Sequence, residues 1–165
     1  MQLTRIFRHL AQPDWWVRRG FPQSALAAVE RAIAASETRH RGELRLVVEA
    51  GLPLGGLLRG ESPRARAIDL FAQLRVWDTV ENSGVLIYLQ LVDRRVEIVA
   101  DRGIDARVGQ EFWNAVCRRM ELAFAGGRCE AGTLAALDEI TEALAAHFPA
   151  RAANPNELPD RPLVL

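Results

Sequence analysis

Acidic and amide side chains near the ends of apolar segments are the residues of this chain whose types could do chemistry. The candidates are six oxygen-bearing residues: Glu37, Glu43, Asp78, Asn82, Asp101 and Asp105. Carboxylate and amide oxygens, with almost no sulfur or imidazole nearby, are the ligands that hard cations such as Ca²⁺ or Mg²⁺ prefer. We therefore treat these six residues as candidate metal ligands, with Glu81 and His40 beside them in the sequence.

Three predicted strands would bring these side chains together. Residues 43–50 and 85–91 are rich in β-branched and apolar residues, and residues 96–100 alternate in polarity after a turn at 92–95. A helical pattern separates the first two strands, which predicts that they run parallel, whereas the tight turn predicts an antiparallel third strand. Asp101 should then lie beside the starts of the first two strands, at one edge of the sheet.

Helical patterns flank these strands and predict the covering layers. Apolar residues recur at spacings of three and four over residues 23–39, 64–77, 109–124 and 131–147. Ser62-Pro63 is typical of a helix start, and Gly126-Gly127 is typical of a helix end. The order predicts an α/β domain with a small mixed central sheet.

Two readings of the acidic residues stay open. They could be solvated loop residues that pair with Arg39, Arg41 and Arg102, rather than metal ligands. The opposite edge of the sheet, with the Gly- and Pro-rich loop 51–63 and the turn at 92–95, has fewer acids and is better suited to an anion or a peptide. That loop has neither the GxGxxG spacing nor the Lys-Ser/Thr ending of a phosphate-binding loop.

Composition excludes several function classes. The 21 arginines balance 21 acidic residues, so the positive field of a nucleic-acid binder is missing, and the chain contains no lysine for Schiff-base chemistry. Its four serines and two cysteines match no nucleophile motif, and its three histidines have no zinc spacing. No apolar run approaches the ~20 residues of a transmembrane helix. The absence of a secretory signal pattern and the isolated cysteines predict a cytoplasmic protein.

The chain divides into three segments by composition. Residues 1–21 form a basic, aromatic N-terminal arm, residues 22–149 form the main domain, and the Pro-rich residues 150–165 are predicted to be a flexible tail. Trp15 and Trp16 in the arm could make weak contact with a membrane surface.

The motifs together resemble the TPM domain family. The resemblance rests on the helix RARAIDLFAQLRVWDT, the strand pair NSGVLIYLQLVDRRVEIVADRGID, the spaced Trp113, Met120, Phe124 and Gly132, and the terminal His-Phe-Pro. It covers about residues 25–149 and includes the junction from Ser36 to Glu43. It implies a three-layer α/β/α sandwich, described as Rossmann-like, with a small central sheet.

The resemblance also implies functions. Members of the family are associated with divalent-cation binding, with acid phosphatase activity and with membrane maintenance. This chain has Asn82-Ser83-Gly84 where many relatives have Asp-Asn-Gly, and Asp101-Arg102-Gly103-Ile104-Asp105 where they have Gly-x-Gly-x-Glu. Since no nucleophile is recognisable, we expect a non-catalytic binding or assembly module that serves a protein partner, such as a membrane-associated one. The alternative is a divalent-cation-dependent phosphatase that uses the acidic residues to act on small phosphoesters.

Overall fold

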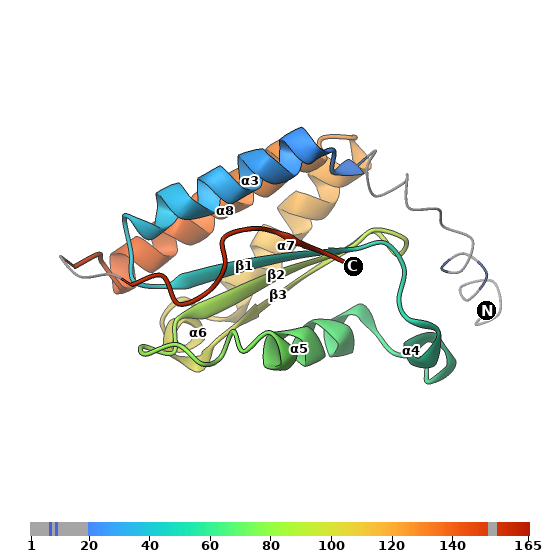
Figure 1. The fold of residues 1–165 in the computed structure, drawn as a ribbon, viewed down its shortest axis with the longest axis horizontal. Coiled ribbons are helices and arrows are strands. Elements are labelled where there is room, and N and C mark those ends of the chain that lie inside the picture. The colour runs from blue at the N-terminus through green and yellow to red at the C-terminus, as the bar shows by residue number, and fades with distance from the viewer. Residues whose placement is uncertain (1–6, 8, 10–19, 152–154) are drawn as a thin grey trace.

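The computed structural model describes residues 7, 9, 20–151 and 155–165, and it shows a mixed α/β fold (Figure 1). The described helices are α3 (Gln23–Glu37), α4 (Leu54–Leu58), α5 (Pro63–Gln73), α6 (Arg102–Val108), α7 (Gln110–Ala125) and α8 (Cys129–His147). The strands are β1 (Glu43–Glu49), β2 (Gly84–Gln90), β3 (Arg95–Ala100) and β4 (Leu163–Val164). The predicted arm, with Trp15 and Trp16, lies largely outside the described residues.

The four strands form one mixed sheet in the order β3-β2-β1-β4. β1 and β2 run parallel with Glu43 opposite Gly84, and β2 pairs antiparallel with β3. Both strand directions confirm the sequence prediction. β4 adds a short parallel pairing with β1, in which Val47 is opposite Leu163.

Helices cover both faces of the sheet, so the three-layer α/β/α arrangement is confirmed. α3, α7 and α8 lie over one face and α5 lies over the other (Figure 1). Successive side chains of β1 point to opposite faces of the sheet, so β1 contributes to two core clusters, one on each face. Leu44 and Leu46 pack with α3, α7 and α8, whereas Val47 packs with residues of α5.

Local signals set several helix ends. The Ser62 hydroxyl accepts a hydrogen bond from the amide of Ala65 and caps α5, as the sequence predicted. Gly127 follows α7 with a φ of 73°, a conformation that glycine adopts without steric cost. The sequence analysis did not predict α6, a helix of seven residues that the Asp101 side chain caps by accepting from the Arg102 amide.

The C-terminal segment, residues 155–165, packs on the domain, where the sequence analysis expected a flexible tail. Leu158 is buried against the α5 side of the sheet, and Leu163 and Val164 form β4. The segment carries few apolar residues of its own. Its backbone is held by side chains of β1, a long-range interaction that local composition does not reveal.

Among the described residues, no helix combines the length and the apolar character that crossing a membrane requires.

Candidate functional site

β2 begins and β3 ends at the same edge of the sheet, and their backbones are in close contact there. The Asp101 amide donates to the Gly84 carbonyl at 2.8 Å, and the Gly103 amide donates to the Asn82 carbonyl at 2.9 Å. A Cβ atom at Gly103 would lie 2.5 Å from the Asn82 carbonyl oxygen, so only glycine fits there. The structure therefore places Asn82 and Asp101 side by side.

Most of the candidate ligands at this edge have protein partners. Asp78 pairs with Arg75, and Asn82 accepts a hydrogen bond from the Arg102 guanidinium at 3.3 Å. Asp105 accepts from the Trp113 indole N–H at 2.8 Å. In the part of the chain that the structure describes, no group of three or more His, Cys, Asp or Glu residues could hold a metal ion.

One oxygen at this edge differs from the others. Asp101 accepts the Arg102 amide with Oδ1 at 2.7 Å, but its Oδ2 is buried and has no hydrogen-bond partner among the described residues. A buried carboxylate oxygen without a partner is costly, because it loses water without replacement. A cation beside this oxygen would offset that cost.

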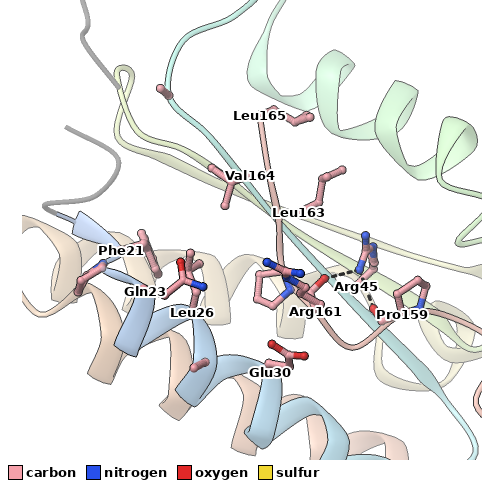
Figure 2. A pocket seen from close by; sticks show the side chains of 14 residues that line it. Phe21, Gln23, Leu26, Glu30, Arg45, Pro159, Arg161, Leu163, Val164 and Leu165 are labelled. Atoms are coloured by element: carbon pink, nitrogen blue, oxygen red, sulfur yellow. Dashed lines mark hydrogen bonds between the residues drawn. The ribbon is translucent and has the colours of Figure 1, made fainter. Parts of the chain in front are cut away.

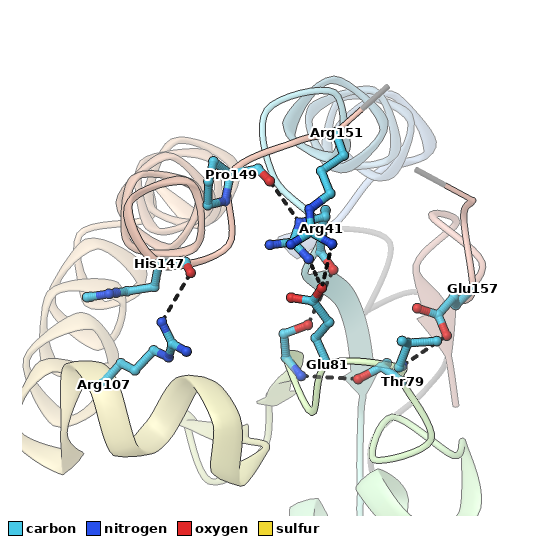
Figure 3. A network of polar contacts seen from close by, with 10 residues as sticks. Arg41, Thr79, Glu81, Arg107, His147, Pro149, Arg151 and Glu157 are labelled. Carbon is cyan, nitrogen blue, oxygen red and sulfur yellow. Dashed lines mark hydrogen bonds and ion pairs between the residues drawn. The ribbon is translucent and has the colours of Figure 1, made fainter. Parts of the chain in front are cut away.

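Arginines accompany the acids at the same end of the molecule (Figure 3). Arg41 pairs with Glu81, and Arg151 lies 3.8 Å from the same carboxylate. Arg107 donates to the His147 carbonyl at 3.3 Å. The edge that the sequence predicted to be acidic is therefore of mixed charge.

Glu43 lies at the same edge, where its backbone pairs with Gly84, but its side chain and that of Glu37 contact the C-terminal segment. Burial, followed by the negative charges of Glu43 and Asp160, raises the pKa of Glu37 to about 8. Burial raises the pKa of Glu43 to about 7, although two backbone amides oppose the shift. At neutral pH both carboxyls therefore retain part of their protons.

Glu43 and its neighbour Arg45 hold the C-terminal segment. The Glu43 carboxylate accepts from the amides of Glu157 and Leu158 at 3.2 and 3.1 Å. Arg45 Nη1 donates to the carbonyls of Pro159 and Arg161 at 2.6 and 2.5 Å. The sequence analysis named Glu43 for a metal and did not consider Arg45, yet both side chains position backbone.

A hollow of about 980 Å³ lies between α3 and this segment (Figure 2). Its lining consists of Phe21, Pro22, Gln23, Leu26, Ala27, Glu30, Arg45, Ala50, Pro159 and residues 161–165. Most of the lining side chains are apolar, and the charged ones are Glu30, Arg45 and Arg161. We refer to this space below as the α3 hollow.

A buried polar cluster at the other end of β1 also went unnoticed in the sequence. The Tyr88 hydroxyl donates to Glu49 at 2.6 Å, and the Arg66 guanidinium donates to both oxygens of the same carboxylate, the shorter bond being 2.7 Å. Every member has a partner, so the cluster joins β1, β2 and α5 rather than offering a free reactive group. An acid near the end of an apolar strand was its only sequence signal.

Comparisons with known proteins agree with the fold. The model of the TPM domain family matches residues 20–143. The NMR structure of the BA42 protein from the psychrophilic bacterium Bizionia argentinensis is similar, with a TM-score of 0.76 and 27% identity over 86% of this chain and 93% of that chain. The N-terminal domain of a protein from P. gingivalis shares the fold, with a TM-score of 0.60 and 17% identity over 78% of this chain and 81% of its own. No curated protein matches the chain.

Proposed function

The chain belongs to the TPM domain family, and we propose that it is a non-catalytic module that binds a partner protein through the α3 hollow. The observation that carries the proposal is the hollow itself, in which apolar side chains lie beside an edge strand, β4 (Figure 2). Apolar surface beside an open strand edge is a common way of binding an extended peptide.

Four of the described serines and cysteines, namely Cys117, Ser36, Ser83 and Ser62, support a binding role rather than catalysis. Burial raises the pKa of the Cys117 thiol to about 11, so it stays protonated at neutral pH. The hydroxyls of Ser36 and Ser83 donate to backbone carbonyls, and that of Ser62 caps α5. These side chains are therefore engaged in structure.

The nature and place of the partner follow from the family and from composition. We propose a membrane-associated protein partner, in line with the family's association with membrane maintenance. We further propose a cytoplasmic location, which suits the two free cysteines, Cys117 and Cys129.

Substitution of Val164 by glutamate is expected to abolish capture of the partner. Val164 lines the hollow and is 43% exposed, so a charge there removes apolar contact without disturbing the core. Affinity capture from a lysate of the native host, quantified by mass spectrometry, measures the effect. Leu122→Glu is the matched control, because Leu122 is exposed on α7 and is not part of the lining.

The proposed binding role requires a partner that is recovered with the original chain and with Leu122→Glu, but not with Val164→Glu. Recovery of the same proteins with all three chains would contradict it, as would reproducible recovery of none. Thermal melts of the three proteins establish that each is folded.

The unpartnered Oδ2 of Asp101 favours a second candidate, the divalent-cation-dependent phosphatase. In it, Asp101 would hold Ca²⁺ or Mg²⁺, and the cation would polarise a phosphate oxygen of a small ester. Ca²⁺ at about a hundred times its dissociation constant is then expected to stabilise the fold by about 2.7 kcal/mol. A thermal melt with and without Ca²⁺ measures this.

Asp101→Asn serves as the control for the cation, since it keeps an oxygen for the α6 cap and removes the charge. A Ca²⁺ shift that persists in Asp101→Asn, or no shift in the original chain, would remove Asp101 as the cation site. Absence of cation-stimulated phosphoester hydrolysis would remove the phosphatase.

A further inference from the structure

The edge of the sheet opposite β4 is formed by β3, which pairs only with β2 among the described strands. β3 is six residues long, and its apolar residues Val96, Ile98 and Val99 are β-branched. An open strand edge of this composition is a template for pairing with another chain. β3 therefore makes the molecule prone to edge-to-edge association unless other groups cover its outer edge.

Side chains bond to the outward-facing backbone of β3. In an antiparallel pair, alternate residues of an edge strand direct their N–H and C=O groups away from the neighbouring strand. The Val96 amide donates to Glu121 Oε1 at 3.1 Å, and the Ile98 carbonyl accepts from Arg64 Nη1 at 2.5 Å. The Ile98 backbone also forms a hydrogen bond with the Cys117 thiol. These contacts occupy positions at which a further strand would form its ladder.

The three side chains come from both faces of the sheet. Cys117 and Glu121 are one turn apart on α7, and Arg64 is in the first turn of α5. α7 and α5 both contact β3 from opposite faces (Figure 1). Ion pairs hold the two charged side chains at the strand, because Arg64 lies 3.9 Å from Glu97 and Glu121 lies 3.6 Å from Arg95.

An incoming strand would have to displace these contacts. It would also cover the charged groups of Arg64 and Glu121, which is costly unless each charge keeps a partner. Val96 and Ile98 are only 3% and 2% exposed, so little of their apolar surface is available to offset that cost.

We propose that Arg64, Cys117 and Glu121 close the edge of β3 and thereby prevent a second copy of the chain from pairing with it. A second copy is the relevant occupant because every copy presents the same strand, and two such strands can pair antiparallel about a two-fold axis. This inference goes beyond the proposed binding function, since it concerns the opposite edge of the sheet and its test needs no partner protein.

The test removes the two charged side chains from the edge and measures self-association by sedimentation velocity over a wide range of protein concentration. The uncapped chain, which combines Arg64→Leu with Glu121→Leu, should associate at least about tenfold more strongly than the original chain. A chain that combines Arg64→Lys with Glu121→Gln keeps a donor and an acceptor, and it should associate no more than the original. Hydrogen exchange should show that the β3 amides of the uncapped chain become protected as its concentration rises.

A chain that combines Arg118→Leu with Glu111→Leu is the control, because it adds the same apolar side chains at exposed positions of α7. Equal self-association of the uncapped and control chains would overturn the inference. So would an uncapped chain that associates no more than the original, or one whose association leaves exchange in β3 unchanged. Circular dichroism establishes that each chain is folded. Arg64→Leu alone, which changes a side chain that is 42% exposed, carries the same test if the uncapped chain does not fold.

Discussion

A chain that ends after Arg151 is expected to be less stable than the full chain by about 3–5 kcal/mol. Truncation exposes the apolar surface that Leu158 buries and removes both backbone donors from the Glu43 carboxylate. It also removes the two carbonyls that accept hydrogen bonds from Arg45. Urea unfolding of both chains, followed by circular dichroism, measures the difference.

Leu158→Ala separates the contribution of apolar packing to stability from that of the backbone hydrogen bonds to Glu43. It should cost about 2 kcal/mol, because it removes the buried side chain and keeps both amide bonds to Glu43. Arg161→Gln, which alters an exposed side chain of the same segment, should change stability by less than about 0.5 kcal/mol. Equal unfolding midpoints for the truncated and full chains would contradict the packed segment and restore the flexible tail that the sequence predicted.

Replacement of Glu49 by glutamine is expected to cost about 3 kcal/mol. Glu49 is 2% exposed, and its carboxylate accepts from Arg66 and Tyr88. The substitution preserves shape but leaves the half-buried Arg66 cation without its negative partner. The cost should appear in urea unfolding as a lower midpoint with an unchanged slope.

Tyr88→Phe provides the comparison for the same cluster. It removes one hydrogen bond and keeps the Glu49–Arg66 pair, so it should cost about 1 kcal/mol. Glu142→Gln, which affects an exposed pair with Arg39, should cost less than about 1 kcal/mol. If Glu49→Gln were no more destabilising than Glu142→Gln, the cluster would not join β1 to α5.

The central sheet was predictable from sequence because its signals are local. The apolar run of β2 predicts a strand covered on both faces, and every residue of β2 is buried. The turn before β3 and the helix between β1 and β2 then determined the strand directions. β1 itself alternates Glu43, Arg45 and Val47 with Leu44 and Leu46, which is the period of two expected of a strand whose faces differ.

The candidate site was less predictable, because side-chain partners come from distant parts of the chain. Strand directions correctly placed Asp101 beside Asn82, but they could not show that Asp101 caps α6 or that Arg102 contacts Asn82. Glu43 and Arg45 contact residues more than a hundred positions away, and no periodicity encodes those contacts. Leu163 and Val164, an apolar pair after a polar stretch, were the only local indication of β4.

The C-terminal segment lies outside the residues that match the family model. The TPM domain match covers residues 20–143, whereas one wall of the α3 hollow is formed by residues 159–165. The family match alone therefore does not describe the proposed binding surface.

Site-specific photo-cross-linking tests the proposed binding function most directly. A photoreactive phenylalanine analogue replaces Val164 in the α3 hollow, and in a second protein it replaces Leu122 on α7. Both full-length proteins are produced in the native host and irradiated. The proposal predicts a single reproducible protein adduct from position 164 and none from position 122. Equal yields from the two positions, or no adduct at position 164, would contradict it.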